Sequence, residues 1–234
     1  MKKYEQIVED IEAYIHDNEL AQGTRLSSVE SYAAHYQVSK STIIKAMDIL
    51  EKKGAIFQQR GSGVFVRRQR RKGYVSLLTN RGFTEELKDF AVTTQLLKLE
   101  LMKPTEEVML NLKLSEEDEV YYVERLRDID GNRLCIEASY FPKKIVTYLN
   151  NEIAEGSIFN YLTEGLKLNI SFADIYLHVD TLNEEQGEKL QLHAGAPALF
   201  VEQVVYLGTG EPFDYSKLTY HYQHSKFFVQ AINF

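Results

Sequence analysis

Two arginines, Arg125 and Arg127, alternate with other residues in a stretch whose pattern is typical of a β-strand. Alternate residues of a strand project from the same face and lie about 7 Å apart, so Tyr121 and Val123 share the face of the arginines. Two guanidinium groups beside apolar side chains suit a planar or tetrahedral anion, because each presents a fork of N–H donors. The alternative is that this face is solvated and the arginines pair with Glu137 or with other surface acids.

A second group of polar side chains lies between residues 39 and 45, where a helix is predicted to begin at Ser39 or Lys40. The hydroxyls of Ser39 and Thr42 suit contacts with phosphate oxygens or base edges, and Lys40 and Lys45 supply cationic donors. These residue types at the start of one helix are typical of a surface that contacts a nucleic acid.

The charge of the chain divides in the same way. Residues 1–72 contain 13 Lys and Arg against 9 Asp and Glu, a net charge of +4. Residues 73–234 contain 14 against 25, a net charge of −11, so the overall −7 averages two different regions. A basic segment joined to an acidic one indicates a polyanionic partner for the first segment only. The alternative is a charged face that is simply solvated.

The elements that must position the polar side chains of residues 39–45 are three helices and a hairpin. The helices are predicted at 4–18, after Ser28 through "VESYAAHY", and from residue 39 or 40 to Gly54. Ile7, Ile11, Tyr14 and Ile15 form the apolar stripe of the first helix, and Ile43, Met47 and Leu50 that of the third. The segments "AIFQQ" and "VFVR", joined by "RGSG", predict a hairpin with a glycine-rich tip. Together these elements predict a winged helix-turn-helix, whose third helix enters the major groove of DNA.

This segment also resembles the DNA-binding domain of the GntR family of bacterial transcription regulators. The matching residues are Leu26, Ser28, Tyr36, Val38, Ser39, Thr42, Ala46, Leu50, Gly54, Gly61 and Gly63. Three positions depart from the family pattern: Ser27 replaces a proline, Val29 a glutamate and Lys40 an arginine. The resemblance implies that the DNA contacts come from Arg25, Ser28, Ser39, Lys40, Thr42, Lys45, Arg60, Gly61 and Gly63. A winged helix used for protein contacts is the alternative.

The second part of the chain is predicted to be an α+β domain with a largely antiparallel sheet. We expect the winged helix-turn-helix domain at 1–66, a linker at 67–75 ("RRQRRKGYV") and an effector-binding and dimerisation domain at 76–234. Two strands flank an Asp130-Gly131 turn, and three further strand candidates lie at 170–182, 198–208 and 212–222. Helices are predicted at 105–113, where Thr105 is the expected cap, and at 143–150, 158–164 and 184–191.

This domain resembles the effector domain of the HutC subfamily, which has a chorismate-lyase-like fold. The landmarks are "GFTEEL" at 82–87, "RLR" at 125–127, "IEASYFP" at 136–142, "GSIFNYL" at 156–162 and "PFDYS" at 212–216. The resemblance implies an anion site formed by Phe83, Thr84, Arg125, Arg127 and Ser157. It implies contacts with sugar hydroxyls from Glu137, Tyr140 and Asp214. The segment "TYHYQHSKFFV" departs from the family pattern, and we assign it no ligand role.

We therefore expect a cytoplasmic, homodimeric transcriptional repressor that binds palindromic double-stranded operator DNA and is released by a phosphorylated sugar. The alternatives are an effector domain that senses another organic acid, or one that only mediates protein contacts or dimerisation. Catalysis is not expected: the sequence lacks His-Glu-x-x-His and Gly-x-Ser-x-Gly, and Cys135 lies in the middle of a predicted strand. No cofactor or metal is expected, and no apolar run approaches the roughly 20 residues of a membrane-spanning helix.

Overall fold

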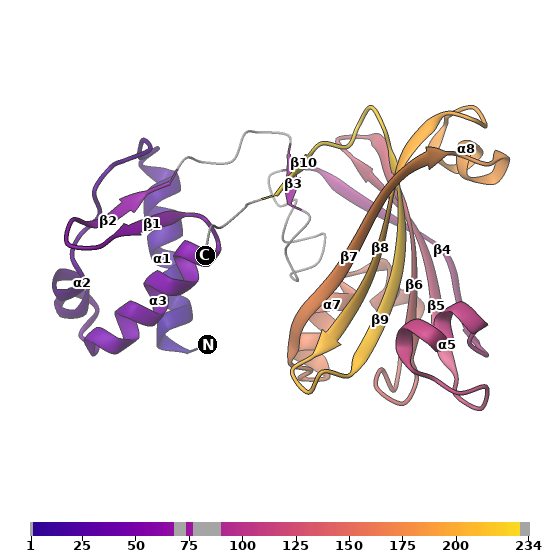
Figure 1. Ribbon diagram of the computed structural model, residues 1–234, viewed down its shortest axis with the longest axis horizontal. Coiled ribbons are helices and arrows are strands. Elements are labelled where there is room, and N and C mark those ends of the chain that lie inside the picture. Colours follow the sequence, from indigo (N-terminus) through magenta and orange to yellow (C-terminus); the bar gives the residue numbers. More distant parts are fainter. Residues whose placement is uncertain (1, 68–73, 77–89, 230–234) are drawn as a thin grey trace. The chain divides into compact units, whose positions relative to one another are not determined.

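The computed structural model describes residues 2–67, 74–76 and 90–229. The chain divides between Gly73 and Tyr74 into two compact units, which are described separately. Figure 1 shows both units and labels most of their elements. No helix of the described residues is long and apolar enough to cross a membrane.

The first unit has three helices followed by a two-stranded antiparallel hairpin. Ser28 and Ser39 begin the second and third helices, because each side-chain oxygen accepts a backbone N–H from the first helical turn. The hairpin strands are joined by a turn that includes Gly61, in the left-handed region with φ +79°. The elements are α1 (Lys3–Asp17), α2 (Val29–Tyr36), α3 (Lys40–Lys52), β1 (Ile56–Gln59) and β2 (Gly63–Val66).

The core of the first unit lies between α1, α3 and the hairpin. The predicted stripe of α3 is confirmed, since Ile43, Met47 and Leu50 are all fully buried. On α1 the stripe differs from the prediction at one position, because Tyr14 is 52% exposed and Val8 is buried. Burying a large apolar side chain contributes about 1.5–3 kcal/mol, so these few residues supply much of what holds the helices together.

The second unit is built on a six-stranded sheet in the order β4-β5-β6-β9-β8-β7 (Figure 1). Every neighbouring pair is antiparallel, as predicted. The turn between β5 and β6 has positive φ at both Asp130 (+49°) and Gly131 (+78°), which suits a tight hairpin. The strands are β4 (Val92–Met102), β5 (Val120–Ile129), β6 (Asn132–Pro142), β7 (Ile170–Thr181), β8 (Pro197–Leu207) and β9 (Pro212–His221).

Helices cover both faces of this sheet. On one face, α5 (Glu106–Leu112) and α8 (Glu184–Leu190) bury Leu112 and Leu190 against the even-numbered side of β5. On the other face lie α6 (Asn151–Glu155), α7 (Ile158–Asn160) and the π-helical turn η1 (Tyr161–Gly165).

A short parallel pair packs near the other end of this second face. It consists of β3 (Val75–Ser76) and β10 (Phe227–Phe228), and the side chain of Val75 is buried with Cys135, Leu218 and Tyr220. The last two residues of the expected linker, Tyr74 and Val75, therefore belong to the second unit. Cys135 is fully buried, as expected of a small apolar side chain in a strand.

One expectation for the second unit differs from the structure, and two elements were not expected. The helix predicted at 143–150 is wrong: the chain makes turns and coil there, although Val146 and Leu149 are buried. The run Ile145, Val146, Thr147 explains this, because β-branched residues lose χ1 freedom in a helix. The sequence patterns also did not predict β4 or α6.

Candidate functional sites

The start of α3 presents a cluster of hydroxyls. The Oγ of Ser39 accepts the backbone N–H of Thr42 at 3.3 Å, which caps the helix. The same Oγ lies 2.8 Å from the Oγ of Ser41 and 2.9 Å from the Oγ1 of Thr42. Ser39 and Ser41 are exposed and Thr42 is half-buried. The cap therefore holds these hydroxyls together at the surface, at the positive end of the helix dipole.

Lys40 and Lys45 of α3 are exposed and make only weak contacts. The Nζ of Lys40 lies 2.7 Å from the Oε1 of Glu30 on α2, and both side chains are more than 60% exposed. The Nζ of Lys45 lies 4.0 Å from the centre of the Tyr4 ring. An exposed ion pair contributes about 0–1 kcal/mol and an exposed cation–π contact about 0.5–1 kcal/mol, so either ammonium group can exchange its partner for a phosphate at little cost.

The hairpin brings the remaining predicted DNA contacts of the first unit together. Arg60 and Gly61 are exposed at its tip. Gly63 has φ +125°, and a Cβ there would lie 3.1 Å from the Nε of Arg25. Arg25 also forms a backbone bridge with Phe65 of β2, so its side chain lies along the hairpin. Ser28, by contrast, caps α2, and its Oγ accepts the N–H of Ser31 at 3.2 Å.

In the second unit, both arginines of the predicted anion site are buried. Arg125 is 3% and Arg127 is 4% exposed, on the face of β5 that α6 and α7 cover. Glu137 lies directly opposite Arg125 on β6 and is 6% exposed. The expected alternative thus holds in part: the arginines do pair with Glu137, but their face is buried and not solvated.

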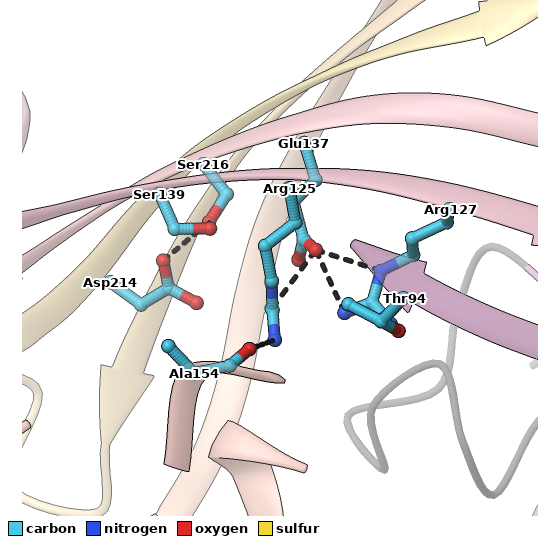
Figure 2. A network of polar contacts seen from close by, with 8 residues as sticks. All are labelled: Thr94, Arg125, Arg127, Glu137, Ser139, Ala154, Asp214 and Ser216. Carbon is cyan, nitrogen blue, oxygen red and sulfur yellow. Dashed lines mark hydrogen bonds and ion pairs between the residues drawn. The ribbon is translucent and has the colours of Figure 1, made fainter. Parts of the chain in front are cut away.

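One carboxylate oxygen joins the two guanidinium groups (Figure 2). The Oε2 of Glu137 lies 2.9 Å from Nη2 of Arg125 and 2.8 Å from both Nη2 and Nε of Arg127. Burial alone would raise the pKa of Glu137, but the charges of Arg125 and Arg127 outweigh it and lower this pKa to about 2. The three residues therefore carry a net charge of +1 in the interior of a strongly acidic unit.

Arg125 keeps one donor without an acceptor. Its Nη1 donates to the backbone oxygen of Ala154 on α6 at 3.2 Å, and its Nη2 faces Glu137. Its Nε, which is buried, has no hydrogen-bond partner in the described part of the chain. Arg127, in comparison, also donates from Nη1 to the Oγ1 of Thr94 on β4 at 3.1 Å. A buried donor without a partner costs about 1–3 kcal/mol, which an acceptor from a ligand would recover.

A second polar group lies beside the arginines on the same face (Figure 2). Asp214 on β9 is 1% exposed, and its Oδ1 lies 2.5 Å from the Oγ of Ser216. That Oγ lies 2.7 Å from the Oγ of Ser139 on β6. Burial raises the pKa of Asp214 to about 7, although the hydrogen bond from Ser216 opposes the rise.

The remaining predicted effector residues are not brought together with this cluster. Ser157 is half-buried and caps α7, where its Oγ accepts the N–H of Asn160 at 3.3 Å. Tyr140 lies on the opposite face of the sheet, with its ring 5.0 Å from that of Tyr122. Phe83 and Thr84 lie outside the described residues. The structure thus joins Arg125, Arg127, Glu137 and Asp214 in one cluster.

Three side chains of the cluster were not among the predicted site residues. Ser139 and Ser216 follow Glu137 and Asp214 by two positions, so strand alternation alone could have placed them on the same face. Thr94 belongs to β4, which was not predicted, so strand alternation could not place Thr94 in the site. Within the described ranges no group of three or more His, Cys, Asp or Glu could hold a metal ion.

Comparisons with known protein families match each of the two units to a family model. The model of the bacterial regulatory proteins of the gntR family matches residues 3–66, and the model of the UTRA domain matches residues 88–226. The chain is 53% identical to the HTH-type transcriptional regulator YydK of Bacillus subtilis, over 100% of this chain and 99% of that protein. It superposes on a crystal structure of YydK with a TM-score of 0.88, covering 99% of this chain and 100% of that one.

Two more distant relatives extend the comparison. The effector-binding domain of the B. subtilis trehalose repressor TreR has a TM-score of 0.56 and 28% identity, covering 60% of this chain and 98% of that one. The mannosyl-D-glycerate transport/metabolism system repressor MngR of Escherichia coli is 25% identical, over 97% of this chain and 95% of that protein.

Proposed function

Because the chain belongs to the GntR family of bacterial regulatory proteins and carries a UTRA domain of the HutC type, we propose that it is a repressor of carbohydrate-use genes that a phosphorylated sugar releases from its operator. GntR regulators bind operator DNA and small-molecule effectors, and they are not enzymes. The repressor role is supported by the relatives named for trehalose and for mannosyl-D-glycerate.

The observation that carries the effector proposal is the buried arginine pair with its unpartnered donor. A unit with 25 acids against 14 bases in its sequence repels anions, so an anion that enters it needs local compensation. Arg125 and Arg127 provide a net charge of +1 with Glu137, and the Nε of Arg125 offers a hydrogen bond that no described residue uses. A phosphate group or a carboxylate satisfies both features.

We assign the anion to Arg125 and Arg127, and we place Asp214 where the uncharged part of the effector binds. Phe83, Thr84 and Ser157 remain proposed contacts from the family resemblance. Tyr140 has no place in this proposal, because it lies on the other face of the sheet.

DNA binding is assigned to the start of α3 and to the hairpin. In a homodimer, one α3 and one hairpin enter each half-site of a two-fold symmetric operator. The hydroxyls around Ser39 contact the duplex, and Lys40, Lys45 and Arg60 neutralise phosphates. The linker at 67–75 joins this unit to the effector unit, and effector binding changes how the two DNA-binding units are spaced.

The coupling between the two sites is reciprocal. If the effector weakens operator binding by some factor, the operator must weaken effector binding by the same factor, commonly about 5–150-fold. An enzyme would consume its ligand, whereas a sensor returns it unchanged. Recovery of intact effector after DNA release therefore separates the two classes.

The experiment is a mobility-shift panel on a duplex from upstream of the gene. Sugar phosphates are compared with their unphosphorylated parents, and we expect release by a phosphorylated sugar and not by its parent. Release by an unphosphorylated carboxylate would show that the arginines bind another organic acid. If no anion released the duplex and release required a second protein, the UTRA unit would serve protein contacts.

A further inference from the structure

The carboxyl group of Asp214 is buried and forms no ion pair with the described residues, although the charge of Arg125 acts on it. Its side chain is 1% exposed, and the one hydrogen bond it makes with the described residues is to Ser216 at 2.5 Å. Arg125 and Arg127 each form an ion pair with Glu137. An isolated carboxylate is costly to bury, and such a group commonly becomes neutral by keeping its proton.

The charged groups around Asp214 do not remove this cost. Arg125 on β5 favours the ionised form of Asp214, whereas Glu137 on β6 opposes it. The helix α6 contributes the backbone oxygen of Ala154 to this cluster, which offers Asp214 no positive charge. Arg127 on the same face is engaged with Glu137, and the residue opposite Asp214 on β8 is the apolar Val205.

The hydroxyls beside Asp214 are arranged so that its protonation state sets their direction. When Asp214 is ionised, Ser139 donates to Ser216 and Ser216 donates to Asp214. When Asp214 is protonated, the donation runs from Asp214 to Ser216 and from Ser216 to Ser139. The neutral form therefore frees the hydrogen of Ser139 to be donated to another acceptor, in addition to the Nε–H of Arg125.

We propose that Asp214 is a neutral carboxylic acid in the empty effector site, and that an anion binds there together with this proton. This inference rests on the proposed anion site at Arg125 and Arg127. It adds the protonation state that Asp214 must have when the anion binds. With Asp214 neutral, the arginines and Glu137 leave a net charge of +1. With Asp214 ionised the net charge is zero, and the attraction for an anion falls.

The consequence is that pH governs the affinity for the anion. A pKa raised by burial to about 7 places this change in the neutral range. The affinity falls as pH rises above the pKa of the empty site, by at most about tenfold per pH unit. It becomes constant again above the pKa of the occupied site, because neither form then holds the proton.

The first test measures the proton directly and needs no effector. The carbonyl stretch of a protonated carboxyl is recorded by infrared spectroscopy for the wild type and for Asp214→Asn. We expect a band at about pH 6 that is missing in Asp214→Asn and that disappears from the wild type as pH rises through about 7. Absence of any band that depends on Asp214 would overturn the proposal.

The second test uses sulfate, whose charge is constant across this range. Calorimetry in two buffers with different ionisation enthalpies measures proton uptake when sulfate binds. We expect uptake of up to about one proton in the wild type just above neutral pH, and none in Asp214→Asn, whose affinity no longer depends on pH. Sulfate binding without proton uptake would overturn the proton linkage while leaving the anion site. Failure of the wild type to bind sulfate at any pH would count against both.

Ser216→Ala keeps the test decisive if Asp214→Asn does not fold. The hydrogen bond from Ser216 favours the ionised form of Asp214, so its loss should move the infrared midpoint and the change in sulfate affinity to higher pH. An unchanged midpoint in Ser216→Ala would contradict the role given to Asp214.

Discussion

Arg127 places two of its guanidinium nitrogens, Nε and Nη2, 2.8 Å from the same carboxylate oxygen of Glu137. The pair is almost fully shielded from water, and the same oxygen also faces Arg125 at 2.9 Å. The arginine pair that was expected to bind an anion therefore already binds one carboxylate. Its capacity for a second anion depends on the donors that Glu137 leaves unused.

Glu137→Gln should lower the free energy of unfolding by about 3–5 kcal/mol, because two buried guanidinium groups lose their counter-charge. Urea unfolding of the two proteins measures this difference. Glu119→Gln is the matched control: Glu119 pairs with Lys143 at 3.0 Å with both side chains more than 40% exposed, and the loss should stay below about 1 kcal/mol. Equal losses of unfolding free energy in the two variants would show that burial does not make the Glu137 ion pairs more important for stability than an exposed pair.

The contribution of Glu137 to stability should disappear in acid. The folded protein lowers the pKa of Glu137 from 4.5 to about 2, so the unfolded chain takes up a proton at a higher pH than the folded chain. The stabilisation is complete above about pH 5 and is lost as pH falls towards 2. Urea midpoints of the wild type and Glu137→Gln should therefore converge over this interval. A difference that stays constant down to pH 2 would contradict the lowered pKa.

Lys40→Ala and Lys45→Ala should each weaken operator binding and lower the slope of log affinity against log salt by about 1. Each residue ends in an exposed ammonium group with only weak contacts, so its removal should leave the fold intact. Fluorescence anisotropy with a labelled duplex measures the slope. Lys143→Ala in the effector unit should leave the slope unchanged. Parallel loss of effector affinity in Lys40→Ala or Lys45→Ala would argue against a division of labour between the units.

Arg127→Ala should bind the operator but no longer respond to the sugar phosphate. Arg127→Lys, which keeps the charge and loses the fork, separates the charge from the geometry of the guanidinium group. Arg133→Ala is the control, because Arg133 pairs with Asp128 outside the buried cluster. The mobility shift with increasing effector is the measurement. Normal release of Arg127→Ala at normal effector concentration would place the anion elsewhere.

Much of the first unit could be predicted because its signals are local. Ser28 and Ser39 are typical helix caps, Ser39 precedes an apolar stripe of helical period, and "RGSG" separates two short β segments, so these elements carry local signals for where they start or stop. Tyr14 was misplaced because helical spacing defines a stripe but not where the stripe meets solvent. A tyrosine at its border remains partly exposed.

The effector unit was less predictable because its contacts are distant in sequence. The strand β4 contains an irregularity between Leu96 and Lys98, which breaks the alternation that identifies a strand. Alternation placed Arg125 and Arg127 on one face, but it could not show that this face is buried. That depends on α6, which supplies Ala154 and was not predicted.

Tyr140 illustrates a limit of reasoning by resemblance. It lies three residues from Glu137 on the same strand, so strand geometry turns the two side chains to opposite faces. Residues of one sequence motif are neighbours in the chain, but on a strand only those that project from the same face of the sheet can line one binding site.

The central claim is that a basic unit binds a duplex while an arginine pair in an acidic unit senses an anion. The most direct test is fluorescence anisotropy of a labelled duplex from upstream of the gene. The duplex is titrated with the protein at several salt concentrations, with and without the releasing sugar phosphate. We predict an affinity that falls steeply with salt, and a further loss with the sugar phosphate that Arg127→Ala does not show. Binding that is insensitive to salt, or a sugar phosphate response that Arg127→Ala retains in full, would contradict it.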